Sequence, residues 1–283
     1  MTRAYFTAAT CATSLFKILS IALNKYNYKF KVENTPPQFL INNTKNINLK
    51  QCKDTVSNNN KGELIIWNHP GNSFLRTQRG ILTKQIRNNI FVTNYHKSIM
   101  IGLLLSDGWV QRRLLWNPRI ALKQSIKNFE YLWSVFNILS VYCSSYPYST
   151  KNIKRGKLFF SVEFQTRQLK SLNEIYNLFY FENNKRKSIT PELIHYIDYI
   201  AIAHWIMGDG AKRNKGIILC TDCFTIKEVV ILMNILLIKF DIKSTIHYDN
   251  NYPRIYINKV ELNKIKSQIK PYFVNRFLYK LNY

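Results

Sequence analysis

The chain has 283 residues, and 46% of them are apolar, which is enough for one large domain or two small ones with a proper core. Lysine and arginine number 41 against 16 acidic residues, so the formal net charge is +25. AT-rich coding would enrich lysine, but it would not make acidic residues scarce. A compact body with this charge repels itself unless a polyanion is near, so we expect nucleic acid as the partner. No uncharged apolar run reaches about 18 residues, so no membrane span is expected.

The five cysteines do not form a metal-binding pattern. Cys220 and Cys223 make a single CxxC without a second pair, so a zinc knuckle is not expected. An odd number of cysteines is typical of a reducing compartment without a disulfide framework.

The first 62 residues differ from the rest of the chain. Residues 1 to 30 contain no acidic residue and have a helical apolar pattern, as a mitochondrial transit peptide does. Alternatively, residues 2–10 (TRAYFTAAT) resemble a stretch of cytochrome c oxidase subunit 1, as an upstream exon read through in frame would produce. Both interpretations predict a mitochondrial protein. Residues 31–62, rich in Asn, Lys and Thr, are typical of a linker.

A weak internal repeat follows. One apolar helix is predicted before Asp107-Gly108 and another before Asp209-Gly210, and the two aspartates are 209 − 107 = 102 residues apart. After each aspartate come a basic strand-like stretch, alternating strands and a closing helix. These are expected at residues 111–113, 160–167 and 169–181 in the first unit, and at 212–215, 254–258 and 225–240 in the second.

The alternation predicts one polar sheet face in each unit. In the strand at 160–167 the apolar residues lie on one face. The opposite face carries Ser161, Glu163, Gln165 and Arg167. We therefore predict an α+β protein with an N-terminal segment at 1–62, a first half at 63–190 and a second half at 191–283.

The two aspartates carry the expected chemistry. Two apolar helices in one chain can bury themselves by packing on each other, and Gly102 and Gly208 would let them approach closely. Parallel packing would bring Asp107 and Asp209 together at one end. Adjacent carboxylates repel unless a divalent cation is bound. Beside a phosphate-binding surface, this arrangement predicts Mg²⁺ (or Mn²⁺) for phosphodiester hydrolysis.

Residues 100–108 (MIGLLLSDG) and 202–210 (IAHWIMGDG) resemble the two motifs of the LAGLIDADG homing endonucleases. The resemblance covers residues 80–283 and departs from the family most at His204, where the motif has glycine. It implies a pseudo-two-fold monomer of two αββαββα halves with a two-helix interface. It also implies that the polar face of each sheet lies in the major groove of a long, asymmetric DNA site.

Polar and basic side chains on these strands are the candidates for DNA contacts. They are Arg112, Arg113, Lys154, Arg155, Lys157, Gln165, Arg167, Lys212, Arg213, Lys215, His247 and Arg254. The resemblance further implies a catalytic lysine near each scissile phosphate, and Lys187 and Lys280 occupy the matching places.

The expected function is double-strand cleavage at an intron insertion site, with Asp107 and Asp209 holding the metal. Two alternatives remain open. A basic surface suits group I intron RNA as well, so the chain could be a splicing maturase. It could also be a retired enzyme that binds ribosomal RNA in a mitochondrial ribonucleoprotein.

Overall fold

The computed structural model describes residues 82–154, 156–180 and 186–281. The chain divides into two units at residues 1–62 and 63–283. The exon-like stretch and the linker predicted for residues 1–62 lie outside the described residues. Within the described part of the chain, no helix is both long and apolar enough to cross a membrane.

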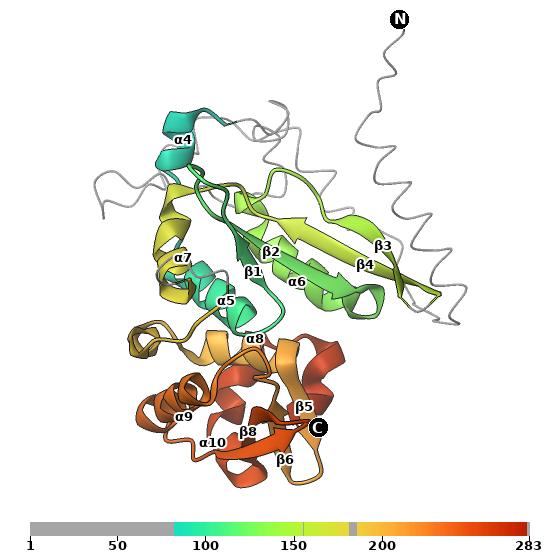
Figure 1. Cartoon of the computed structure of the whole chain (residues 1–283), viewed down its shortest axis with the longest axis vertical. Coiled ribbons are helices and arrows are strands. Elements are labelled where there is room, and N and C mark those ends of the chain that lie inside the picture. Colours follow the sequence, from blue (N-terminus) through green and yellow to red (C-terminus); the bar gives the residue numbers. More distant parts are fainter. Residues whose placement is uncertain (1–81, 155, 181–185, 282–283) are drawn as a thin grey trace, which may run out of the picture. The chain divides into compact units, whose positions relative to one another are not determined.

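The first half contains one antiparallel sheet and the helices that pack on it (Figure 1). A short helix, α4 (Lys84–Asn88), precedes it. The strands are arranged in the order β1-β2-β4-β3. In chain order the elements are α5 (Asn94–Leu105), β1 (Trp109–Gln111), β2 (Arg119–Ser125), α6 (Phe129–Leu139), β3 (Tyr148–Lys154), β4 (Lys157–Gln165) and α7 (Asn173–Phe179).

The second half repeats this order with a second antiparallel sheet, β5-β6-β8-β7. Its elements are α8 (Tyr199–Asp209), β5 (Gly210–Arg213), β6 (Gly216–Leu219), α9 (Ile226–Phe240), β7 (Thr245–Asp249), β8 (Tyr252–Asn258) and α10 (Lys259–Ile269). Each half is therefore αββαββα, and the predicted α+β class is confirmed.

Local sequence explains where several elements begin and end. Asp198 caps α8 by accepting from the backbone of Ala201. Thr225 and Glu228 form a capping box at the start of α9. The β7–β8 hairpin turns at Asn250 and Asn251, whose φ angles of 49° and 66° suit the left-handed tolerance of asparagine.

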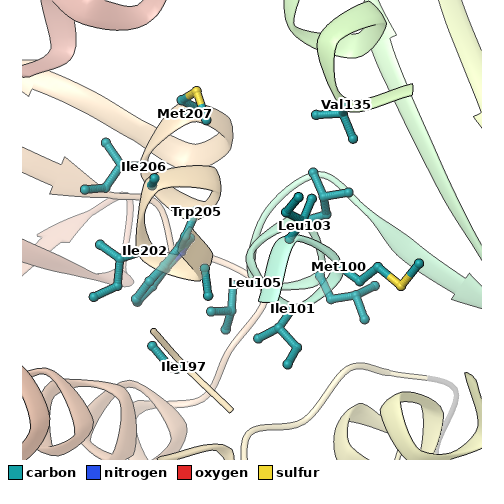
Figure 2. Close-up of a cluster of buried hydrophobic side chains, with 14 of the residues drawn as sticks. Met100, Ile101, Leu103, Leu105, Val135, Ile197, Ile202, Trp205, Ile206 and Met207 are labelled. Atoms are coloured by element: carbon teal, nitrogen blue, oxygen red, sulfur yellow. The ribbon is translucent and has the colours of Figure 1, made fainter. Parts of the chain in front are cut away.

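Helices α5 and α8 pack directly against each other. A Cβ atom on Gly102 would lie 2.4 Å from the carbonyl oxygen of Ala201, and one on Gly208 would lie 2.4 Å from Oγ of Ser106. The N-terminal ends are also joined, because Ser98 donates to Asp198 at 2.6 Å. The two helices are therefore parallel, and Figure 2 shows the apolar side chains gathered around them.

Three expectations about the closing helices need correction. The helix predicted at residues 225–240 is α9, which lies between β6 and β7, so α10 closes the second half instead. The helix expected at residues 169–181 is shorter: a 3₁₀ turn at Lys170–Leu172 leads into α7. The apolar run at residues 229–238 predicts a helix that is buried all round, yet Val230, Leu237 and Ile238 of α9 are exposed. Only one side of α9 is buried, because the helix lies on the outside of the sheet and its other side is exposed.

Candidate active site and nucleic-acid interface

The two aspartates lie together at the C-terminal ends of α5 and α8. Asp209 is the last residue of α8, and Asp107 follows Ser106, the C-cap of α5. The position of a Cβ on Gly208 is only 3.7 Å from Oδ2 of Asp107. The small residue before each aspartate thus lets the two helix ends, and their carboxylates, approach.

Burial and the nearby Asp107 carboxylate together change the pKa of Asp209. Burial, and next to it the negative charge of Asp107, raises the pKa of the Asp209 carboxyl from 3.8 to about 7. Among the described residues, no group of three or more His, Cys, Asp or Glu side chains is arranged to hold a metal ion. A divalent ion here would take carboxylate oxygens of Asp107 or Asp209 from the protein and its other ligands from phosphate and water, as Mg²⁺ does at phosphoryl sites.

Gln124 holds the carboxylate of Asp107. Its Nε2 donates to Oδ2 of Asp107 at 2.6 Å, while its Oε1 accepts from Nδ2 of Asn128 at 3.2 Å. Gln124 is buried on the helix-facing side of β2, in register with Ile120 and Leu122. Both ends of the amide are engaged, so the donor is fixed toward Asp107.

The second half has a different residue at this place. Trp109 pairs with Ala121, and Ala211 pairs with Ile218, so the register makes Thr221 the counterpart of Gln124. The Thr221 hydroxyl donates to the carbonyl oxygen of Pro253 at 2.5 Å, not to Asp209. The surroundings of the two aspartates are therefore unequal.

Both predicted lysines reach the same helix ends. Lys187 donates through Nζ to the carbonyl oxygens of Leu104, Ser106 and Gly108, at 2.8, 2.9 and 3.1 Å. A cation at this position is stabilised by the partial negative charge of the helix C-terminus. Burial lowers the pKa of the Lys187 ammonium, and the nearby Asp209 and Asp107 oppose that change.

Lys280 does the same for α8. Its Nζ donates to the carbonyl oxygens of Ile206 and Met207, at 3.2 and 2.6 Å. Burial lowers its pKa to about 8. Each aspartate thus has a buried ammonium group on the same helix terminus, although the catalytic role of these lysines stays a prediction.

His204 fills the space behind the aspartates. Its Nδ1 lies 3.2 Å from the hydroxyl oxygen of Tyr131, on α6 of the other half. Complete burial lowers the pKa of the His204 imidazole to about 4, so the ring is neutral near pH 7. The bulky His204 fits because residue 102, opposite it, is a glycine. A Cβ atom added to Gly102 would lie only 2.7 Å from the Cβ of His204.

Residues 97–265 match the model of the LAGLIDADG DNA endonuclease family. The chain belongs to this family. The matched residues include α5 and α8, and Asp107 and Asp209 lie at the C-terminal ends of these helices.

The chain is similar to proteins named as an mRNA maturase and as intron-encoded endonucleases. The chain is 34% identical over 211 residues to the cytochrome b mRNA maturase bI2 of Saccharomyces cerevisiae, covering 70% of this chain and 50% of the maturase. It is 30% identical over 200 residues to the probable intron-encoded endonuclease 1 of Wickerhamomyces canadensis, covering 67% of this chain and 85% of that protein. The chain thus spans about half the length of the yeast maturase.

A solved structure has the same fold. The homing endonuclease I-WcaI, bound to its DNA recognition sequence, superposes with a TM-score of 0.64 at 24% identity. The match covers 75% of this chain and 94% of that one. The LAGLIDADG homing endonuclease fold predicted for the chain is therefore confirmed.

Each of the two sheets has an open face, opposite the side on which the helices pack. On the first sheet, Gln165 lies on this face as predicted and donates to Glu163 and Tyr148, at 2.6 and 3.0 Å. Other residues on the open face by register are Gln111, Arg119, Lys123, Thr150 and Asn152.

On the second sheet, a groove on the open face gathers several predicted DNA contacts. Arg213, Lys215 and His247 line it, and the His247 ring stacks on Tyr256 with ring centroids 4.5 Å apart. Arg213, Lys215 and His247 remain predicted DNA contacts. Lys212 is exposed at the neighbouring position of β5, but it pairs with the buried Ile217 and so lies on the helix-facing side of the sheet. The prediction that Lys212 lies on the open face is therefore wrong.

Arg254 lies on the open face of the second sheet but is already paired. Its guanidinium binds both carboxylate oxygens of Asp222, at 2.7 and 2.8 Å, and also contacts Asp249. The ion pair with Asp222 raises the pKa of Arg254 further above its ordinary value. This guanidinium would have to exchange those partners before it could bind a phosphate or a base.

The structure does not place Arg167 where the alternation predicted. β4 ends at Gln165, and Arg167 is buried, with its backbone N–H donating to Tyr142 at 2.6 Å. The strand's alternation stops before this residue, so the prediction that Arg167 lies on the open face is wrong.

The remaining candidates lie at hairpin ends. Arg112 and Arg113 begin the β1–β2 loop, just after β1 ends at Gln111. Lys154 and Lys157 pair at the end of the β3–β4 hairpin, where their side chains and residue 155, Arg155, fall outside what the structure describes.

Two residues that contact predicted site residues, Gln124 and Asp222, were not predicted from the sequence. Gln124 could have been found, because it is a polar residue at a position where the alternation of β2 calls for an apolar one. Asp222 gives no such signal, since it follows β6 in an irregular segment.

Proposed function

We propose that the chain is a single-chain, two-motif homing endonuclease that cuts both strands of a long, asymmetric double-stranded DNA site. The observation that carries the proposal is the pair Asp107 and Asp209 at the adjoining ends of two parallel helices. Each half offers one carboxylate and one sheet, so one monomer can address two strands. The relatives encoded by introns support an origin in a mitochondrial intron.

The site's donor set fits a divalent metal such as Mg²⁺ or Mn²⁺. The pKa of Asp209 is about 7 because the carboxyl is buried beside a second carboxylate. A divalent cation would stabilise the charged carboxylate against both its burial and the repulsion from Asp107. Asp107 and Asp209 are the residues that would hold it. When bound, the metal supplies Lewis-acid stabilisation of charge on the reacting phosphate.

The chain's own residues prepare the reaction around that position. Gln124 fixes the orientation of the Asp107 carboxylate. Lys187 and Lys280 place positive charge beside the aspartates, where it opposes the charge that grows on a phosphate under attack. His204 is buried and neutral, so it fills space without adding charge.

Splicing of the host intron is a second candidate function. The yeast relative is named a maturase, and so is a second relative from Debaryomyces hansenii, 30% identical over 204 residues. The basic surface would serve RNA as well as DNA. A purely structural RNA-binding role is disfavoured, because two adjoining carboxylates repel a phosphate ligand.

The decisive experiment uses duplex DNA that joins the two exons flanking the gene. Purified protein with Mg²⁺ should cut both strands, whereas Asp107→Asn and Asp209→Asn should lose double-strand cleavage and still bind the duplex. Normal cutting by either variant would disprove the active-site assignment. If the wild type binds the intron RNA and promotes its splicing but never cuts the duplex, the maturase role replaces the endonuclease.

A further inference from the structure

The β1–β2 loop of the first half ends in an apolar tip formed by Leu114, Leu115 and Trp116. These side chains are 89%, 95% and 52% exposed. The corresponding turn of the second half, between β5 and β6, is short and carries Asn214 and Lys215 instead. One hairpin therefore presents apolar side chains to its surroundings, and its counterpart presents a polar amide and a cation.

The backbone of the tip is in an unfavourable conformation for its sequence. The N–H of Trp116 donates to the carbonyl oxygen of Arg113 at 3.0 Å, which closes a four-residue turn. Leu115, its third residue, has a φ of 67°, a value that this turn usually reserves for glycine. The Leu115 side chain is exposed, so its burial does not stabilise the fold and does not offset the strained backbone.

The setting of the tip points to DNA. β1 starts two residues after Asp107 and belongs to the sheet whose open face is proposed to enter a major groove. Arg112 and Arg113 precede the tip and can bind phosphates beside it. In the major groove of DNA, the apolar feature available to a side chain is the 5-methyl group of thymine. RNA has no such methyl group, and its major groove is too narrow for side chains.

We infer that the apolar tip contacts thymine methyl groups in the DNA major groove, to one side of the cut. The inference rests on the proposed function, because it requires the open sheet face to lie against duplex DNA. Leu115 lies eight residues after Asp107, and eight residues span at most about 29 Å when extended. At about 3.4 Å per base pair, the contacted thymines lie within about nine base pairs of the phosphate beside Asp107.

Binding to two matched duplexes tests the inference. One is a 30-base-pair alternating adenine–thymine duplex, and the other has uracil in place of every thymine, so only the methyl groups differ. Burial of one thymine methyl group against the tip should make the wild type bind the thymine duplex about three- to fourfold more tightly than the uracil duplex. The variant Leu114→Ser/Leu115→Gly should lose this preference. Lys215→Ser, in the equivalent turn, should weaken binding to both duplexes equally.

Thermal unfolding provides a separate measurement on Leu115→Gly. Relief of the left-handed leucine should raise the melting temperature by about 1–3 °C, after the entropic cost of glycine. A fall of several degrees would mean that Leu115 supports the fold, which overturns the inference.

The outcomes separate the two proposals. If the wild type binds neither duplex, the DNA-binding function fails and the inference fails with it. Equal binding to both duplexes, or a preference that survives in the tip variant, overturns the inference alone. If the tip variant instead loses affinity for an adenine–uracil RNA duplex, the tip contacts RNA and the inference is wrong.

Discussion

At the scale of single residues, the two aspartates differ in their neighbours. Asp107 accepts a hydrogen bond from Gln124, whereas the counterpart of that glutamine, Thr221, is engaged with Pro253. A hydrogen bond to a carboxylate fixes its orientation. In the proposed active site, the carboxylate of Asp107 is therefore held in one orientation by a side chain that has no equivalent beside Asp209.

The first prediction concerns Gln124→Leu, which removes the donor at nearly constant volume. Loss of a group that orients a metal ligand costs roughly 10- to 100-fold in activity or metal affinity. We expect one strand to be cut more slowly by that factor, so that nicked DNA accumulates. End-labelled strands followed over time on denaturing gels measure this.

Thr221→Val is the matched control for that variant. It removes a buried hydroxyl from the equivalent position without touching an aspartate, so it should not produce a strand bias. Equal slowing of both strands by Gln124→Leu would contradict the assignment of Gln124 to one centre.

At the scale of elements, the pair α5 and α8 is the core that both halves share. A Cβ on Gly102 would fall within 2.4 Å of a backbone oxygen of α8, where no flexible side chain can move aside. The carboxylates can adjoin only because the helix backbones do. Packing and catalysis therefore depend on the same small residues.

The second prediction is that Gly102→Ala destabilises the protein. The added methyl group forces the helices apart, and overpacking of this kind costs about 1–3 kcal/mol. The free energy of unfolding, measured by urea titration, should fall by that amount, and cleavage should fall with it. Asn234→Ala, at an exposed position in α9, should leave both unchanged, and an unaffected Gly102→Ala would show that the helices are not in close contact.

The third prediction concerns the pH dependence of the same interface. In the unfolded chain His204 takes up a proton near pH 6.5, whereas in the folded protein burial delays this to about pH 4. The free energy of unfolding therefore contains the full contribution of neutral, buried His204 above pH 6.5. This contribution is lost as the pH falls toward 4. The loss amounts to about 3 kcal/mol.

His204→Gln removes this titration and keeps a group that can pair with Tyr131. Unfolding free energies measured from pH 7 to pH 4 should fall less steeply for the variant than for the wild type. Parallel curves for the two proteins would mean that His204 is not buried in its neutral form.

At the scale of the whole molecule, the chain is strongly positive, but its candidate active site contains two acidic side chains. The net charge is +25, yet Asp107 and Asp209 adjoin where a phosphate is proposed to bind. Without metal the carboxylates repel that phosphate, and with metal they attract it. DNA affinity should therefore respond to divalent ions through these two residues.

The fourth prediction is that Ca²⁺, at constant ionic strength, strengthens binding of wild-type protein to exon-junction DNA. Constant ionic strength matters because added salt alone weakens phosphate contacts. The variant Asp107→Asn/Asp209→Asn should bind more tightly than the wild type without metal and should not respond to Ca²⁺. Equal responses in titrations followed by fluorescence anisotropy would exclude these aspartates as the metal site.

Local patterns in the sequence determined the repeat of an apolar helix followed by alternating strands and the pairing of the two helices that end at Asp107 and Asp209, whereas the full αββαββα order came from the family resemblance. An apolar helix, its cap and an alternating strand are each encoded within a few residues, so periodicity is enough to find them. The repeat then placed Asp107 and Asp209 at corresponding positions. The basic surface followed from composition alone.

Only the tertiary structure decided which polar side chains are available for function. Arg254 is tied to Asp222, 32 residues away, and Arg167 is buried beyond the end of its strand. Lys187 and Lys280 reach helix ends that lie more than 70 residues earlier in the chain. Such partners are set by packing between distant segments, and the spacing of residues along the chain carries no information about them.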